Sequence, residues 1–140
     1  RWLRSPDDLT APFALRIRVF CDEQGYAREM ELDGTDDTAW HLLLLADGTP
    51  AGTGRLYWRS AEEGCMGIGR LAVDQVWRGY GFGSILVKEM EKRAERMGAS
   101  TLLLDAQTRA IGFYEKLGYA VCGEEHMDGH VPHKMMKKRL

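Results

Sequence analysis

The sequence predicts a mixed α/β fold, in which helices cover both faces of a mostly antiparallel sheet. Short apolar segments fill residues 40–73 and are separated by turn formers, which is typical of antiparallel strands. The rest of the chain alternates amphipathic and apolar segments in the order strand, helix, strand, helix, strand, which favours parallel neighbours. At 140 residues the chain has the length of one domain, so we expect a single domain over 1–140.

The first part of the chain predicts one helix followed by a long loop. Residues 1–4 fit either an edge strand or a frayed end. Thr10 is a candidate cap for a helix over about 11–24, whose apolar residues recur at helical spacing: Phe13, Ile17, Phe20 and Cys21. Residues 23–39 are polar and rich in turn formers, so we expect a loop, and loops of this length are often functional.

The middle and the end of the chain supply the remaining elements. Three strands are predicted over 40–46, 51–60 and 65–73, with turns at 47–50 and 61–64. A helix over about 81–97 has an apolar stripe and ends at Gly98. An apolar strand follows at 100–106, then a short helix at 109–117, and candidate closing strands at 119–125 and 133–140.

Composition and charge exclude several classes of protein. The net charge of −2 predicts no electrostatic attraction to nucleic acid. No apolar run approaches the roughly 18 residues of a membrane span, and we find no signal-peptide pattern. The chain begins at Arg1 without a methionine, so we expect residues upstream of it. We expect a cytoplasmic protein without membrane association, and exposed strand edges would allow a homodimer.

Cysteine and histidine residues do not predict a metal site. Cys21, Cys65 and Cys122 are odd in number and widely spaced, which indicates reduced thiols. The spacings among His126, His130 and His133 occur in zinc sites, but Gly129 and Pro132 would break a helix that aligned them. We interpret these histidines as structural or substrate-pocket residues and expect no metal.

The stretch "WRGYGFGS" at 77–84 is the most informative motif. Glycine N–H groups at the start of a helix form a nest for an anion, with the positive end of the helix dipole behind it. Arg78 adds charge, so Arg78, Gly81 and Gly83 together suggest a pyrophosphate site. A P-loop would need a lysine after Gly83, where Ser84 stands. A dinucleotide motif forced onto "GIGRLA" at 67–72 leads to no helix, which leaves a simple strand–helix turn as the other interpretation.

The surrounding sequence resembles the GNAT superfamily of N-acetyltransferases, which use acetyl-coenzyme A as the acetyl donor. The resemblance covers 70–126, through "RLAVDQVWRGYGFGSILVKEMEKRAERMG" and "LLLDAQTRAIGFYEKLGY". A weaker match extends to the bacterial ElaA-like and YjcF-like subgroup through "VFCDEQG", "ELDGTDDTAWH", "GTGRL" and "GHVPHKMM". The family fold implies that the strands at 65–73 and 100–106 are parallel neighbours splayed at one end.

The resemblance also implies roles for particular residues. Backbone amides of the glycine stretch would bind the coenzyme pyrophosphate: Arg78, Gly79, Tyr80, Gly81, Phe82, Gly83 and Ser84. The strand segment Leu71, Ala72 and Val73 would pair with the pantetheine arm and offer an N–H to the thioester carbonyl. Gln107 stands where the family often has asparagine and would contact the coenzyme. Phe113 and Tyr114 would lie on the helix beside the acyl end. We expect Phe113 to pack inward and Tyr114 to point toward the cleft, where the resemblance implies that it is the general acid that protonates the departing thiolate.

The general base and the acceptor site are less defined. Many family members carry a glutamate on the strand before the glycine stretch, where this chain has Gly67 and Gly69. Candidate bases, acting through water, are Glu23, Asp33, Asp36 and His41. Candidate acceptor-site residues are Glu23, Gln24, His41, Arg55 and His133. A polar helix end and a salt bridge explain Glu23, Gln24 and Arg55 equally well.

The function predicted from the sequence is transfer of an acetyl group from acetyl-coenzyme A to a primary amine, by direct attack in a ternary complex. The amine could belong to a small molecule or to a peptide, and carboxylates clustered at 29–37 hint at a cationic acceptor. The alternative is a non-catalytic domain that binds or senses acetyl-coenzyme A. The missing strand carboxylate favours that alternative, whereas Tyr114 favours an enzyme.

Overall fold

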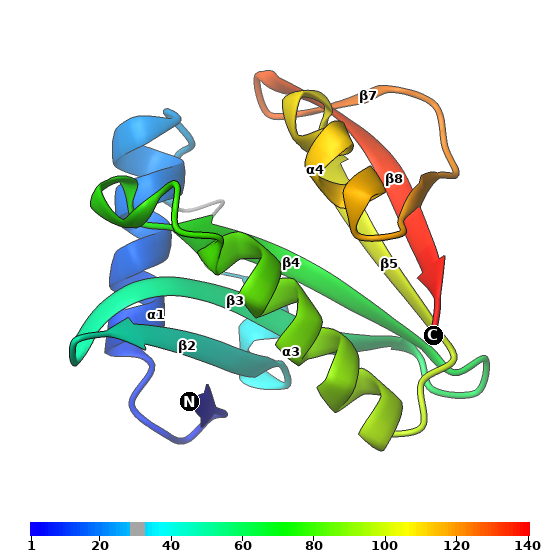
Figure 1. Cartoon of the computed structure of the whole chain (residues 1–140), viewed down its shortest axis with the longest axis horizontal. Helices are drawn as coiled ribbons and strands as arrows, with labels where there is room; N and C mark the ends of the chain where they lie inside the picture. The colour runs from blue at the N-terminus through cyan, green and yellow to red at the C-terminus, as the bar shows by residue number, and fades with distance from the viewer. Residues whose placement is uncertain (29–32) are drawn as a thin grey trace.

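The computed structural model describes residues 1–28 and 33–140. One sheet of eight strands has the order β1-β2-β3-β4-β5-β8-β6, with β7 paired to β8 (Figure 1). β4 and β5 are parallel to each other, and the other neighbours are antiparallel. The strands are β1 (Trp2–Leu3), β2 (Trp40–Ala46), β3 (Thr49–Ser60), β4 (Cys65–Val73), β5 (Thr101–Gln107), β6 (Ala120–Val121), β7 (His126–Asp128) and β8 (Val131–Arg139). The predicted mixed, mostly antiparallel sheet is confirmed.

The two parallel strands are joined over only part of their length. β4 and β5 pair from Cys65 with Thr101 to Ile68 with Leu104, and Figure 1 shows them diverging beyond that point. β4 also contains a bulge, because two steps along β3 match three steps along β4 between Gly69 and Ala72. Arg70 lies in this bulge, directly after Gly69, with a φ of 50°, a value that residues other than glycine rarely adopt. The bulge turns the end of β4 away from β5 and opens the sheet at its centre.

Helices cover both faces of the sheet, as predicted. The helix α1 (Thr10–Arg16) continues into the π-helix η1 (Ile17–Glu23) on one face, and α3 (Phe82–Arg96) and α4 (Ile111–Lys116) lie on the other (Figure 1). Three short 3₁₀ segments connect the elements: η2 (Gly34–Asp37), η3 (Gln75–Trp77) and η4 (Thr108–Ala110).

Two glycines of β3 allow α3 to lie directly on the sheet. A Cβ atom at Gly52 would lie 3.0 Å from a methyl of Leu86, and one at Gly54 would lie 2.7 Å from a methyl of Met90. Leu86 and Met90 are fully buried, as the apolar stripe predicted. The main core lies between this helix and the sheet, and its buried members include Leu56, Met66, Leu102, Tyr114 and Met136.

The N-terminal elements differ in detail from the prediction. Residues 1–4 contain an edge strand, β1, paired with β2. Thr10 is the first helical residue rather than the cap, and its N–H and hydroxyl both donate to Asp8 Oδ1 at 3.0 and 2.6 Å. The predicted loop at 23–39 contains η2, which begins after Asp33 with a capping box to Asp36. Residues 29–32 of this loop lie outside the described part.

The C-terminal strands were predicted with the wrong limits. The expected strand at 119–125 is reduced to β6, Ala120–Val121, and the strand β7 was missed. β7 and β8 form a hairpin that turns at Gly129, whose φ is 62°. His126 and Met127 of β7 are both exposed, so β7 lacks the alternation of apolar and polar residues that indicates a strand in a sequence. No helix within the described ranges is long and apolar enough to span a membrane.

Candidate active site

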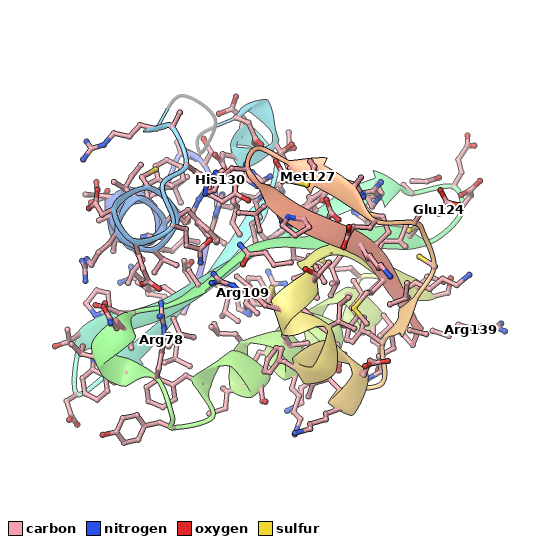
Figure 2. The ribbon with its side chains drawn as sticks, turned by 90° about the horizontal axis from the view of Figure 1, so that it is seen from above. Arg78, Arg109, Glu124, Met127, His130 and Arg139 are labelled. Atoms are coloured by element: carbon pink, nitrogen blue, oxygen red, sulfur yellow. The ribbon has the colours of Figure 1, made fainter. Side chains whose placement is uncertain are left out.

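The splayed end of the sheet contains a cleft of about 820 Å³. One wall is the end of β4, including Leu71, Ala72 and Val73, and the other comprises the end of β5 and the start of α4. The end of η1 closes one side, and Figure 2 shows the labelled side chains of Arg78 and Arg109 on either side of the opening. The bulge in β4 and the short parallel pairing therefore create the cavity where the motifs predicted a site.

The glycine stretch forms an open loop at the N-terminus of α3. Gly79 and Gly81 have φ values of 88° and 77°, a backbone region that L side chains rarely adopt, and Gly81 directly precedes the helix. No atom lies within 4 Å of a Cβ built at either position. The loop thus offers backbone N–H groups and free space beside a helix of 15 residues, which suits a pyrophosphate.

Gly83 has a different local role from its two neighbours. It lies inside α3, and a Cβ there would come within 3.1 Å of the Phe113 ring. This close approach brings α3 and α4 together at the edge of the cleft. Tyr80, Trp77 and Phe82 pack together beside the loop with ring centroids 5.8–6.1 Å apart, and Tyr80 remains 64% exposed.

Arg78 and Glu23 were predicted as separate site residues, and the structure joins them. Nη1 and Nη2 of Arg78 donate to the two carboxylate oxygens of Glu23 at 2.7 and 2.8 Å, and Nε donates to the Val73 carbonyl at 3.1 Å. The hydrogen bond from Arg78 lowers the pKa of Glu23. Glu23 is therefore an ionised partner of the arginine, which weakens the case for it as a base.

Tyr114 lies on the cleft wall and is 9% exposed. Its ring packs edge-on against Phe113 and Tyr119, at centroid distances of 5.0 and 6.0 Å. Phe113 was expected to pack inward, but it is less buried than Tyr114 and also lines the cleft. Burial raises the pKa of Tyr114 to about 12, so its hydroxyl keeps its proton at physiological pH. Within the described residues no group hydrogen bonds to that hydroxyl.

Gln24 and Gln107 meet across the cleft. Gln107 Nε2 donates to Gln24 Oε1 at 2.8 Å, and Arg109 Nε donates to Gln107 Oε1 at 2.9 Å. Two further contacts connect the same side to the β7–β8 hairpin: His130 Nε2 lies 2.7 Å from the Gln24 carbonyl, and the Tyr26 hydroxyl donates to the Asp128 carbonyl at 3.0 Å. These contacts bridge the two halves of the splayed sheet on the side away from α3. The sequence does not predict the contacts of Tyr26, Asp128 and Arg109, because only the folded chain brings these residues together.

The remaining candidate bases belong to an ionic cluster beneath α1, in which Asp36 and His41 are buried and Asp33 is exposed. Asp36 accepts hydrogen bonds from Arg16 at 2.7 Å and from Arg55 at 3.0 Å, and Asp33 accepts from Arg55 at 2.7 Å. Burial alone would raise the pKa of Asp36, but the two arginines more than offset it, so the pKa lies below its usual value. The same balance, with Arg55 as the main partner, lowers the pKa of Asp33.

His41 and Arg55 lie in the same region with different access to the cleft. His41 is 1% exposed, its Nε2 lies 3.1 Å from the Asp36 carbonyl, and it is absent from the cleft wall. Arg55 lines the cleft, and its Nε is a buried donor without a partner in the described part of the chain. His133 also lines the cleft, with its Nδ1 2.9 Å from the Val131 carbonyl. Of the predicted acceptor-site residues, His41 alone is placed away from the cavity.

The positions of the missing strand carboxylate are occupied by an aromatic ring. A Cβ at Gly67 would lie 2.6–2.8 Å from atoms of the Tyr57 ring, and one at Gly69 would lie 3.4 Å from Arg55 Nε. Within the described ranges, no group of three or more His, Cys, Asp or Glu residues is arranged to hold a metal ion.

Comparisons with known proteins agree with this geometry. The model of the acetyltransferase (GNAT) family matches residues 8–119. The chain is 36% identical to the N-acetyltransferase YjcF of Bacillus subtilis, over 96% of this chain and 95% of that protein. An acyl-CoA N-acyltransferase from Pseudomonas aeruginosa superposes with a TM-score of 0.87 at 27% identity, covering 99% of this chain and 97% of that one. Escherichia coli ElaA superposes with a TM-score of 0.86 at 24% identity, covering 99% and 98%. The chain therefore belongs to the acetyltransferase (GNAT) family and is an acetyl-coenzyme A-dependent N-acetyltransferase.

Proposed function

We propose that the protein transfers an acetyl group from acetyl-coenzyme A to the primary amine of a small molecule, by direct attack in a ternary complex. The observation that carries the proposal is one continuous cleft. It runs from Arg78 and Gly83, at the two ends of the glycine loop before α3, to the side lined by Gln24, Gln107 and His133. A donor and an acceptor entering from opposite sides would meet between β4 and β5.

The donor side uses backbone groups for most of its binding. The amides of residues 78–84 would hold the pyrophosphate, with Arg78 adding a charge-assisted hydrogen bond. The end of β4, from Leu71 to Val73, does not pair with β5 and would pair with the pantetheine arm instead. Gln107 and Phe113 line the wall beside that arm. The residues present therefore fit acetyl-coenzyme A.

The acceptor side favours a small amine over a peptide. The contacts of Gln24 and Tyr26 with Gln107, His130 and Asp128 bridge the rim and would obstruct an extended peptide on this side. The carboxylates at 29–37 suggested a cationic acceptor, but those that the structure describes do not support this suggestion. Asp33 and Asp36 both accept hydrogen bonds from arginines, so their charges are already balanced.

The chemistry requires an oxyanion stabiliser and an acid beside the departing sulfur. An N–H of the bulged end of β4 would face the thioester oxygen as negative charge develops there. Tyr114 would donate its proton to the thiolate as the C–S bond breaks, because its raised pKa keeps the hydroxyl protonated and no described residue holds it. The cytoplasmic location and a homodimer stay predictions.

A binding experiment and a transfer experiment test the proposal together. Calorimetry with acetyl-coenzyme A should give saturable binding at one site. Release of free thiol on adding small primary amines should exceed release with water alone. Binding without transfer to any small amine would contradict the proposed acceptor.

A further inference from the structure

Asp105 and His126 form a pair on the acceptor side of the splayed sheet. Asp105 Oδ2 and His126 Nε2 lie 2.8 Å apart, and His126 Nδ1 lies 3.4 Å from the Glu124 carbonyl. Asp105 lines the cleft, whereas His126 lies outside the lining and is reached from the cleft through Asp105 and water. The side chains of Asp105 and His126 are 34% and 43% exposed, so water reaches both of them.

The strand register places Asp105 level with the missing carboxylate of β4. β4 and β5 stop pairing at Ile68 and Leu104, so Gly69 and Asp105 are the next residues on the two strands. Ile68 and Leu104 both point into the core beneath α3. Because side chains alternate along a strand, positions 69 and 105 face the opposite side, toward the acceptor. β5 thus supplies a carboxylate at the level where β4 has glycine.

The other carboxylates near the acceptor side are less suited to this role. Asp128 lines the cleft, but its Oδ2 lies 4.0 Å from His133 Nε2, too far for the hydrogen bond that Asp105 makes with His126. Glu23 is held by Arg78, and Asp33 and Asp36 are held by Arg55 and Arg16. Each of these contacts stabilises the ionised form and lowers the pKa of the carboxyl group. In contrast, Asp105 has a histidine as its partner, and a neutral imidazole can take up a proton near neutral pH.

We propose that the Asp105–His126 pair accepts the proton that the acceptor ammonium must lose before it attacks. This assignment rests on the proposed function. The ammonium gives one proton through water to the neutral imidazole of His126, and Asp105 stabilises the imidazolium that forms. The neutral nitrogen then bonds to the thioester carbon. When the C–S bond breaks, Tyr114 protonates the sulfur, the second proton of the nitrogen replaces the one that Tyr114 gave, and His126 returns its proton to solvent.

The local electrostatics are consistent with this role. The hydrogen bond to Asp105, followed by the contact with the Glu124 carbonyl, raises the pKa of His126. A raised pKa makes the imidazole a stronger base and requires a pH above that pKa for it to accept a proton. Other titratable or charged groups on this side of the cleft and beside the pair are Tyr26, Tyr57, Arg59, Arg70, Arg109, Glu124, Asp128 and His133.

Comparing two amines of similar size distinguishes a role of the Asp105–His126 pair in accepting a proton from a purely structural role. Ethylamine is an ammonium at pH 7 and must lose a proton, whereas 2,2,2-trifluoroethylamine is mostly neutral and need not. Asp105→Asn and His126→Gln should each lower kcat/KM for ethylamine by roughly 100-fold and affect trifluoroethylamine much less. The control Glu125→Gln, which removes an exposed charge next to His126, should change neither value.

The pH dependence gives a second readout from the same variants. With trifluoroethylamine as a reference, wild-type kcat/KM for ethylamine should fall as the pH drops through the raised pKa of His126. Asp105→Asn removes the largest cause of that raised pKa, so this limb should move to lower pH, and His126→Gln should abolish it. Equal losses for both amines, or no loss, would overturn the assignment while leaving the proposed function standing. A wild-type protein that binds acetyl-coenzyme A but acetylates neither amine would overturn both.

Discussion

Glu23 and Arg78 are 55 residues apart in the chain and form a bidentate ion pair at the mouth of the cleft, with N–O distances of 2.7 and 2.8 Å. The pair connects the end of η1 to the glycine loop. Because Arg78 Nε also donates to the Val73 carbonyl, the guanidinium is fixed beside the place proposed for the pyrophosphate. We therefore propose that Glu23 acts on the donor side of the cleft, by positioning Arg78.

Removing Arg78 should weaken coenzyme binding without unfolding the protein. A charge-assisted hydrogen bond to phosphate contributes about 1–3 kcal/mol, so Arg78→Ala should raise the Kd for acetyl-coenzyme A by roughly 5- to 150-fold. Glu23→Gln should raise it less, since the arginine remains but is less well held. If Glu23 acts through Arg78, adding Glu23→Gln to Arg78→Ala should cost nothing more. Calorimetry on the three variants, with Arg96→Ala as the control, checks this, and additive losses would contradict it.

The glycine loop and the helix that follows it should respond differently to substitution. Gly81→Asp should abolish acetyl-coenzyme A binding, because it places a carboxylate in the proposed phosphate nest at a φ of 77°. Gly83→Asp should also abolish binding, and it should lower the melting temperature because its Cβ meets Phe113 at 3.1 Å.

Gly112→Ala is a matched control for these two variants. Gly112 lies in α4 with no atom within 4 Å of a built Cβ, so alanine should preserve binding and slightly raise stability. Calorimetry and thermal unfolding measure both properties. Normal affinity in a folded Gly81→Asp variant would show that the loop is only a turn.

The buried cluster under α1 should contribute to stability in a pH-dependent way. Asp36→Ala removes the carboxylate that Arg16 and Arg55 share, and these two arginines are only 1% and 5% exposed. The substitution should therefore lower the free energy of unfolding in urea at pH 7 by roughly 3–5 kcal/mol. Asp37→Ala, at an exposed neighbouring position, should cost little.

The sign of the pH effect follows from the lowered pKa of Asp36. The stabilisation is fully present above the unfolded-state pKa of about 3.9, and it is lost as the pH falls through the lower folded-state pKa. Wild type should therefore lose stability more steeply below about pH 4 than Asp36→Ala does. Equal slopes for the two proteins would contradict this account.

The sequence predicted the elements whose cues are local. The apolar stripe through Leu86 and Met90 located α3, and the glycines at 79–83 located the loop before it. The splayed parallel pair followed from the order of motifs and the family resemblance. The signals for α3 and its loop lie within the features that they predict, whereas the splayed pair required information from the whole motif order and from the family.

What the sequence could not predict depends on contacts between distant segments. The positive φ of the bulge falls on Arg70, a residue type that does not predict it, and β7 is too short and exposed to show alternation. The pairing of Glu23 with Arg78, and of Asp105 with His126, needs the tertiary fold to bring the partners together. The first pair weakens the case for Glu23 as the base and the second supplies another candidate, although the motifs alone had located the cleft.

Tyr114 provides the sharpest test of the chemistry. The described residues make no hydrogen bond to its hydroxyl, and burial raises its pKa to about 12, so the group is a protonated donor facing the cleft. Tyr114→Phe removes only that hydroxyl and should lower kcat by roughly 10- to 1,000-fold, with the Kd for acetyl-coenzyme A and the melting temperature little changed.

Tyr119→Phe is the matched control for this variant. Tyr119 packs against Tyr114, but its hydroxyl donates to Glu91 at 2.8 Å, away from the cleft wall. Its removal should lower stability by about 1 kcal/mol or more and leave kcat near that of wild type. Steady-state thiol release and thermal unfolding on both variants separate the two roles. Full turnover in a folded Tyr114→Phe variant would mean that the thiolate leaves unprotonated or takes its proton from water, and the acid assigned here would be wrong.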